Sequence, residues 1–506
     1  QTSASGYLNP PSKASGIAVA LFQNQILNPA NNNVNILMQA DRVSKFEALL
    51  NCFLGGFIMT KDMTEGNIWK HLFSFAIPLL LGNLFQQTYN MIDTAIVGQY
   101  LGEEKLASVG ASSSVQFLVL GFCMGICCGF AIPVSQHFGG KNIHKMKEAI
   151  FHAGFLSILF AAVITTACAI LCPNILHILS TPENIFTDAY SYLFIIFLGI
   201  PFTILYNLLS GLLRAVGDSK TPFLFLVFSS ILNIILDLTF IIVFKLGVSG
   251  AALATIISQG VSGLLCLIYI IKKLPILCIS KEHCRIKSDT TKQMIVMGVP
   301  MGLQYSITAI GSMVMQSANN GLGSTYISGF TAGMRIKQFL MCPFDAIATA
   351  ASTFCSQNFG AGNLKRIKEG LKKGVTIGVC YGLISGCILI LFGRTLSLLF
   401  ISRNATAVLD ASGKYLACLG CFFWALGILN VCRMSVQGLG YAGRAVFSGA
   451  VEMIARIFVS LMFVPIFKFN AICFADQTAW IFACLYIVPT CLICLKKIEK
   501  NLKSAK

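Results

Sequence analysis

Twelve apolar segments, each near the length of a membrane-spanning helix, follow one another along this sequence. An α-helix needs about 20 apolar residues to cross the hydrocarbon core of a bilayer. Of the 506 residues, 56% are hydrophobic and only 11% are charged, and the mean hydropathy is +0.75. Soluble proteins have far more charge and less apolar material. We therefore predict an all-α integral membrane protein with twelve transmembrane helices.

The expected helices alternate with short polar loops. They cover residues 69–98, 106–138, 148–172, 185–210, 222–244, 249–275, 292–318, 326–358, 370–393, 406–432, 444–467 and 472–495. In the second of them Gly121, Gly125 and Gly129 recur at every fourth position. A small-residue face of this kind predicts close packing against another helix.

Basic residues in the loops predict the orientation of the chain. Most loop Lys and Arg, with Arg433 counted among them, lie on the side of the two core termini. The opposite loops hold only Lys105, Lys245, Arg394, Arg403 and Lys468. Because basic loops stay in the cytoplasm, both core termini are expected there. The net charge of +17 then reflects membrane topology, and we expect no nucleic-acid partner.

The N-terminal stretch over residues 1–58 is polar and Asn-rich, unlike the rest of the chain. Met59 begins a short polar lead into the first helix, so we expect residues 1–58 to be a disordered or non-native N-terminal extension. A short regulatory tail is the alternative. The remaining parts are expected to be an N-terminal six-helix lobe (59–275), a basic cytoplasmic loop (276–291), a C-terminal six-helix lobe (292–495) and a basic cytoplasmic tail (496–506) that contacts membrane lipids.

The two halves repeat each other. Pro78 and Pro300, which we expect to bend the first helix of each half, stand at corresponding positions, and SQHFGGKN from Ser135 matches SQNFGAGN from Ser356 at almost the same offset. Because each half has an even number of crossings, the halves share one topology and are related by a pseudo-two-fold axis along the membrane normal. Two such lobes enclose a central cavity, and rocking them against each other gives alternating access. The repeat therefore predicts a secondary transporter.

Sequence motifs argue against other classes. No Walker A sequence is present, so direct drive by ATP is not expected, and neither HExxH nor GxSxG suggests an enzyme. The pairs Cys418/Cys421 and Cys491/Cys494 have metal-like spacing but no neighbouring His. We interpret these cysteines as packing residues and expect neither a metal nor a cofactor.

Two acids of the first half lie deep inside apolar segments. A carboxylate at the centre of a bilayer costs about 2.5–3.5 kcal/mol on insertion scales, so it needs a partner, a proton or a wet cavity. Asp93 has no basic residue within two helical turns, and Asp237 is equally isolated, with Asn233 one turn before it. The alternatives to a functional role are a hydrogen-bonded interhelical carboxylate for either acid, or a position near the headgroups for Asp93.

Several motifs resemble those of the multidrug and toxic compound extrusion (MATE) family, in particular its DinF- and MepA-like bacterial branch. They are the early proline of the first helix, MIDTAIVGQYLG after it, SQHFGG and SQNFGAG at the ends of the second and eighth helices, and LLRAVGDSKTP after the fourth. The resemblance extends from about Thr64 to Lys497. It implies a monomeric antiporter in the plasma (inner) membrane of a bacterium that exports organic, mostly cationic, compounds in exchange for H⁺ or Na⁺.

The resemblance also implies a site. In this branch the N-terminal lobe binds a cation or proton, and the matching positions here are Asp93, Asn233, Asp237, Thr255 and Tyr89. Oxygen ligands suit a hard monovalent cation, and two neighbouring carboxylates can instead hold a proton. The sequence does not choose between the two ions.

The C-terminal half differs from this pattern. Glu452 and Arg456 stand at the repeat positions of Asn233 and Asp237, and their i, i+4 spacing predicts a structural ion pair. The stretches GVPMGLQYSITAIGSM and LACLGCFFWALGILN of the seventh and tenth helices hold no acid, so we expect no C-lobe cation site of the NorM kind. Residues that could line a substrate cavity are Gln86, Tyr206, Asn207, Gln304, Tyr305 and Asp345.

The sequence is also compatible with two other functions. A flippase for lipid-linked oligosaccharides belongs to the same superfamily, but its cavity would carry several cations, and Arg456 is the clearest intramembrane cation here. A polytopic receptor or scaffold without transport is the alternative from another class.

Overall fold

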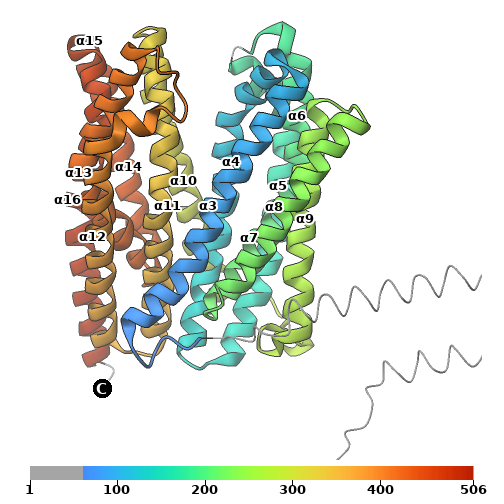
Figure 1. The fold of residues 1–506 in the computed structure, drawn as a ribbon. Helices are drawn as coiled ribbons and strands as arrows, with labels where there is room; N and C mark the ends of the chain where they lie inside the picture. The colour runs from blue at the N-terminus through green and yellow to red at the C-terminus, as the bar shows by residue number, and fades with distance from the viewer. Residues whose placement is uncertain (1–60, 180, 505–506) are drawn as a thin grey trace, which may run out of the picture. The chain divides into compact units, whose positions relative to one another are not determined.

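The computed structural model describes residues 61–179 and 181–504, and within these ranges it contains helices, turns and loops but no β-strand. The expected extension over residues 1–58 lies outside the described residues. Helices carry the labels of Figure 1. Those of the first half are α3 (Ile68–Leu101), α4 (Glu103–Gly139), α5 (Ile143–Ile178), α6 (Glu183–Leu198), α7 (Ile200–Ala215), α8 (Lys220–Leu238) and α9 (Val248–Lys273).

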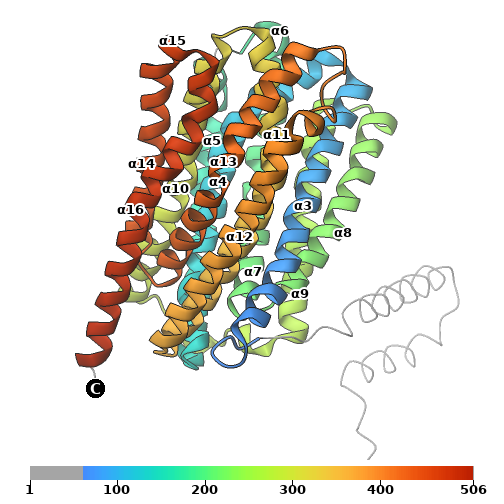
Figure 2. The same ribbon diagram turned by 60° about the vertical axis from the view of Figure 1, so that its left-hand side comes forward.

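The second half follows after two short 3₁₀ turns, Pro275–Leu277 and Lys281–His283. Its helices are α10 (Ser288–Asn320), α11 (Ser324–Gly360), α12 (Leu364–Ser397), α13 (Thr406–Gly438), α14 (Ala442–Phe458), α15 (Val464–Phe467) and α16 (Phe469–Ser504). Figure 2 shows α12, α13 and α16 side by side, as their packing contacts require.

The prediction of twelve transmembrane segments is confirmed. Within residues 61–179 and 181–504, eleven helices are long and apolar enough to cross a membrane, and the pair α6 and α7, bent by 43°, supplies the twelfth span. The bend was not predicted: the expected helix over 185–210 is interrupted at Gly199. Pro201 then occupies the first turn of α7, where its missing N–H costs no helical hydrogen bond. Pro78 and Pro300 instead lie inside the continuous helices α3 and α10.

Both halves contain a π-helical turn at the same place in the repeat. Residues Thr239–Val243 extend α8, and Val459–Phe463 extend α14. Such turns are rare and often mark functional sites. Here one closely follows Asp237 and the other closely follows Arg456. Neither turn could be expected from the sequence, because hydrophobic periodicity does not distinguish one wide turn inside an apolar helix.

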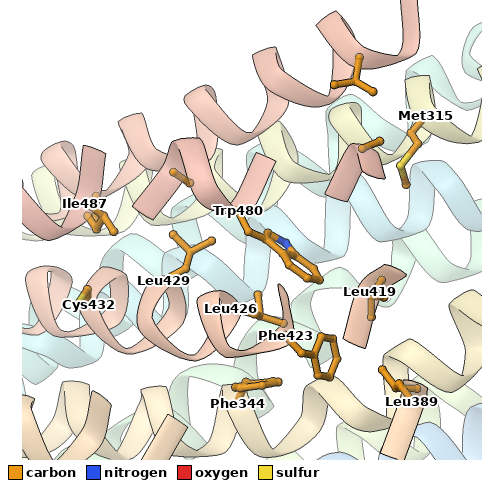
Figure 3. Close-up of a cluster of buried hydrophobic side chains, with 14 of the residues drawn as sticks. Met315, Phe344, Leu389, Leu419, Phe423, Leu426, Leu429, Cys432, Trp480 and Ile487 are labelled. Atoms are coloured by element: carbon orange, nitrogen blue, oxygen red, sulfur yellow. The ribbon is translucent and has the colours of Figure 1, made fainter. Parts of the chain in front are cut away.

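A large hydrophobic core lies inside the second half, between α11, α13 and α16. Phe423 of α13 packs between Phe344 and Trp480, with ring centroids 5.2 and 5.9 Å apart (Figure 3). A smaller cluster in the first half joins Ile96 of α3 to Tyr192 of α6 and brings these helices beside α9. Each half therefore has its own apolar core.

Small residues allow α4 of the first half to meet α10 of the second. A Cβ on Gly125 would lie 2.6 Å from the carbonyl oxygen of Met301, and one on Gly129 would lie 2.5 Å from the Cα of Gly298. Real side chains do not approach so closely, so only glycine fits. The predicted packing face on the second helix is confirmed, and its partner is the first helix of the other half.

The loop between the halves is fastened to α5. Lys287, the residue before α10, donates its backbone N–H to His152 Nε2 at 2.9 Å, and its Nζ lies 2.5 Å from Glu148 Oε1. His152 Nδ1 lies 2.7 Å from the Glu148 carbonyl oxygen, so both ring nitrogens are engaged. The start of α10 is thus held by the first half of the chain.

Candidate functional site

The two intramembrane acids of the first half meet between α3 and α8. Asp93 is half-buried on α3, Asp237 is fully buried on α8, and their carboxyl groups are close enough to interact electrostatically. Neither acid forms a salt bridge with any described residue. The apolar residues Ile96 and Ile241, about one turn from each acid, pack in one cluster and hold the two helices together.

Several buried polar atoms of this site have no hydrogen-bond partner in the part of the chain that the structure describes. Asp93 Oδ1, both carboxylate oxygens of Asp237 and both amide atoms of Asn233 are buried without a hydrogen bond among the described residues. Buried polar atoms normally have hydrogen-bond partners, so these atoms are available to hold a cation, a proton or a water molecule. The donor set is rich in oxygen and carries two acids, which suits a hard monovalent cation or a shared proton.

Tyrosine side chains border the acid pair. Tyr89, one turn before Asp93 on α3, interacts with both acids and with Gln86. Tyr192 of α6 is 4% exposed and lies near both acids and near Gln116. Tyr192 could not be predicted as a site residue, because one tyrosine in an apolar helix gives no signal until the fold brings it beside the acids.

The sixth transmembrane helix contributes less to the site than expected. Thr255 lies half-buried on α9 and makes no hydrogen bond with either acid among the described residues. Ser258, one turn further along α9, is buried, and its hydroxyl oxygen has no partner in the described part of the chain. The structure therefore brings Tyr89, Asp93 and Asp237 together, with Asn233 one turn before Asp237 on α8, and within the described residues Thr255 forms no hydrogen bond with them.

The residues expected to line a substrate cavity divide into two groups. Gln304 is buried and accepts a hydrogen bond from Gln437 at 2.5 Å, so its side chain belongs to the packing between α10 and α13. Tyr206 donates to the Pro222 carbonyl at 3.4 Å, and Asn207 donates within its own helix at 2.8 Å.

The other three expected cavity residues form the second group. Gln86 on α3 and Asp345 on α11 are exposed, and Tyr305 on α10 is half-buried. Asp345 interacts electrostatically with Arg433, and its Oδ1 lies 3.5 Å from the Asn430 amide nitrogen. Together they supply an acid, an aromatic ring and an amide at accessible positions.

A chain of buried charges crosses the second half. Glu452 and Arg456 form an ion pair at 2.7 Å, and Glu452 also binds Arg433 at 2.6 Å. Arg456 continues to Asp476 of α16 at 2.9 Å, and Asp476 binds Lys337 of α11 at 2.5 Å. The expected i, i+4 pair is therefore the centre of a larger network that joins α11, α13, α14 and α16.

This network corrects two sequence-based expectations. Arg433, counted among the loop cations, is buried inside α13. Arg456 is accompanied by two further buried cations, Arg433 and Lys337, and each of them is bonded to an acid. Cations that are neutralised in this way are not available to bind a pyrophosphate, so the larger number of cations does not favour the flippase alternative.

Reciprocal hydrogen bonds join the two halves where α4 and α11 end. Gln136 Nε2 of α4 donates to the Gly438 carbonyl of the second half at 2.9 Å. Gln357 Nε2 of α11 donates to the Ala215 carbonyl of the first half, also at 2.9 Å. These are the glutamines of SQHFGG and SQNFGAG, so the motif residues themselves connect the halves. We call this arrangement the glutamine latch.

A strap of residues 61–66 closes over the same end. The Met63 N–H donates to Gln357 Oε1 at 2.9 Å, and the Lys61 N–H donates to the Val216 carbonyl at 3.1 Å. Arg366 of α12 donates to the carbonyls of Met63 and Gly66 at 3.0 and 2.9 Å. The strap therefore touches both halves.

Known proteins share both the repeat and the fold. A family model described as MatE matches the chain twice, over residues 78–239 and over residues 300–462. The chain belongs to the MatE family. Each match begins at the early proline of its half, Pro78 or Pro300. The resemblance that rested on sequence motifs is thereby confirmed.

Curated relatives of this MatE protein come from bacteria. The probable multidrug resistance protein YpnP of Bacillus subtilis (strain 168) is 34% identical over 382 residues, which cover 75% of this chain and 84% of that protein. The multidrug export protein MepA of Staphylococcus saprophyticus is 25% identical, and the match covers 76% of this chain and 86% of that protein. A probable multidrug resistance protein NorM of Thermotoga maritima is 26% identical, with coverage of 74% and 80%.

Solved structures share the fold of this MatE protein. A crystal structure of MATE in complex with MaL6 superposes with a TM-score of 0.82 at 20% identity and covers 87% of this chain and 99% of that one. An outward-facing multidrug resistance MATE family transporter of the MOP superfamily gives 0.81, also at 20% identity, with coverage of 86% and 98%. The two-lobe, twelve-helix architecture is therefore that of MATE transporters.

Proposed function

We propose that this chain is a secondary active multidrug efflux transporter of a bacterial plasma membrane. It works as a monomer and exports organic, mostly cationic compounds in exchange for H⁺ or Na⁺. The observation that carries the ion-coupling proposal is the pair Asp93 and Asp237, which has orphaned buried oxygens and no basic partner among the described residues. The names of the relatives YpnP and MepA support the export of drugs.

The coupling ion acts on the helices that hold the acid pair. Two ionised carboxylates repel each other across the contact between α3 and α8. A proton or Na⁺ on the pair removes this repulsion and lets the helices and the π-helical turn Thr239–Val243 pack more closely. The ion therefore favours one arrangement of the first half, and release of substrate accompanies the change.

The glutamine latch faces the cytoplasm in this proposal. The ends of α4 and α11 lead into loops rich in Lys and Arg, and basic loops stay on the cytoplasmic side. Because the latch and the strap close that end, the proposal assigns the structure to an outward-facing state. Rocking of the halves breaks the latch and opens the cytoplasmic side.

Substrates meet the accessible polar residues between the halves. Asp345 supplies a negative charge, Tyr305 an aromatic ring and Gln86 an amide. A planar organic cation can pair with the carboxylate and stack on the ring. No catalytic residue is assigned, because export needs no covalent step.

The test is ethidium export from proteoliposomes that contain the full chain. A proton gradient or a sodium gradient is imposed across the membrane, one in each experiment. We expect one of the two gradients to drive export, and we expect Asp93→Asn and Asp237→Asn each to lose at least about tenfold in rate, since an amide cannot carry the proton or the full ligand charge.

Asp410→Asn is the matched control. Asp410 is an exposed acid paired with Arg394 at 2.7 Å, far in sequence from the acid pair. Its variant should export normally. Gradient-driven export that survives in Asp237→Asn would show that this acid does not couple the ion. If folded wild-type protein exports ethidium under neither gradient, the flippase alternative gains weight.

A further inference from the structure

The fold places a copy of the acid site in the second half. Asn233 and Asp237 of α8 correspond in the repeat to Glu452 and Arg456 of α14, and both helices continue into a π-helical turn. By the same repeat, Thr255 of α9 corresponds to Asp476 of α16.

Asp93 of α3 corresponds to Met315 of α10, at the same offset as the prolines Pro78 and Pro300, and Met315 is buried at 1% exposure. The first-helix acid thus has no counterpart, while the three other positions are all polar in both halves. Repeat geometry therefore brings the same set of positions together twice, with different residue types.

The two copies differ in what satisfies their acids. In the first half the oxygens of Asp237 have no protein partner among the described residues. In the second half Arg456 lies between two carboxylates, with Nη2 2.7 Å from Glu452 Oε1 and Nε 2.9 Å from Asp476 Oδ1. Tyr415 donates a further hydrogen bond to Asp476 at 3.0 Å. In the second half the guanidinium of Arg456 thus satisfies the carboxylate oxygens of Glu452 and Asp476. The oxygens of Asp237 in the first half have no such partner among the described residues.

The guanidinium excludes a free cation for two reasons. It already donates hydrogen bonds to the carboxylates that an ion would use, and a covalently tethered donor has a far higher effective concentration than an ion in solution. Lys337 and Arg433 also pair with these acids, so Glu452 and Asp476 are each bonded to two basic side chains. An additional cation would have to displace one of these buried bases.

We propose that Arg456 is a tethered counter-cation that fills the C-terminal copy of the cation site, so that ion binding and coupling are confined to the N-terminal copy. This inference rests on the proposed antiport function. The C-terminal half then keeps the ion-loaded arrangement through the whole cycle. Only the first half responds to the coupling ion.

The first experiment measures ion binding to purified protein, with ²²Na⁺ and with proton uptake as the two probes. Binding by the wild-type protein should be lost in the double variant Asp93→Asn/Asp237→Asn. Binding that remains in this double variant and disappears on further Glu452→Gln substitution would overturn the inference. Wild-type protein that binds neither probe would instead contradict the proposed antiport function.

The second experiment tests the tether itself by chemical rescue. Arg456→Ala should lower the melting temperature by several degrees, because one partner of a buried charge network is removed. Millimolar methylguanidinium should restore a large part of that loss, whereas potassium chloride at equal ionic strength should not. Arg394→Ala, which breaks an exposed pair with Asp410, is the matched control and should not respond to methylguanidinium.

If Arg456→Ala is destabilised but methylguanidinium has no effect on it, the idea of a cation-shaped site is wrong. If Arg456→Ala does not fold, the ion-binding experiment on the double variant still decides. Together, the two experiments should show one ion-binding region in the wild type, at Asp93 and Asp237. They should also show a methylguanidinium-binding site that is created in the second half when Arg456 is removed.

Discussion

At the scale of single residues, burial decides which charges are costly to remove. Asp476 accepts hydrogen bonds from Lys337, Arg456 and Tyr415, and its side chain is 1% exposed. Asp410 bonds only Arg394 among the described residues, and its side chain is 64% exposed. The two aspartates have similar ion-pair distances but very different surroundings, so their contributions to stability should differ.

Asp476→Asn should therefore destabilise the protein strongly. Loss of one member of a buried ion network leaves other charges without a partner, which costs about 3–5 kcal/mol, whereas an exposed pair contributes about 0–1 kcal/mol. Thermal unfolding of the detergent-solubilised protein, followed by intrinsic fluorescence, measures the difference. Equal melting temperatures for Asp476→Asn and Asp410→Asn would contradict this assignment.

Asp93 and Asp237 could be identified as candidate site residues from the sequence, because each is an acid in an apolar helix with no base nearby, which is unusual. The network of buried ion pairs around Asp476 could not be predicted from the sequence. Lys337, Arg433 and Asp476 lie on three different helices, and only the tertiary fold shows that each has an opposite charge beside it.

At the scale of helices, the glutamine latch connects the two halves by hydrogen bonds. Gln136 and Gln357 each donate to a backbone carbonyl at the end of a helix in the opposite half. The motif residues were predicted to end the second and eighth helices, and α4 and α11 do end within those motifs. Their partners could not be predicted, because a backbone carbonyl acceptor leaves no trace in the sequence.

Gln136→Ala and Gln357→Ala should each loosen the latched end. A neutral hydrogen bond contributes about 0.5–1.5 kcal/mol, so each variant should shift the opening equilibrium by roughly two- to tenfold. Hydrogen–deuterium exchange should become faster in peptides that contain residues 61–66 and 136–142. Gln99→Ala is the control, since Gln99 is exposed at the other end of α3, and exchange in these peptides should not change. Unchanged exchange in both latch variants would show that other contacts hold the halves together.

At the scale of the whole molecule, the sequence repeat and the apolar segments were sufficient to predict two lobes of six spans. The break in the fourth span was missed because Gly199 and Pro201 stand inside an otherwise continuous apolar run. The apolar composition of this segment predicts that it crosses the membrane, but it does not predict where the helix bends. On the two sides of the bend, α6 and α7 each pack against both α4 and α9.

Orientation in the membrane is a property of the whole chain and can be tested with inserted epitopes. An epitope placed in the loop at Arg403 should bind antibody on intact spheroplasts. The same epitope at Arg285, between α9 and α10, should bind only after the membrane is permeabilised, because that loop is basic. The reverse pattern would place the latch on the outer face of the membrane.

The anchoring of Lys287 to α5 means that the peptide link between the halves is not what keeps them together. Trypsin cleavage after the exposed Lys281 or Arg285 leaves the contacts of Lys287 with His152 and Glu148 intact. The two fragments should therefore copurify and still export ethidium. Separation of the fragments in mild detergent would show that covalent continuity is needed after all. If the two fragments stay together, the protein behaves as a heterodimer of two related subunits that are joined in one polypeptide chain.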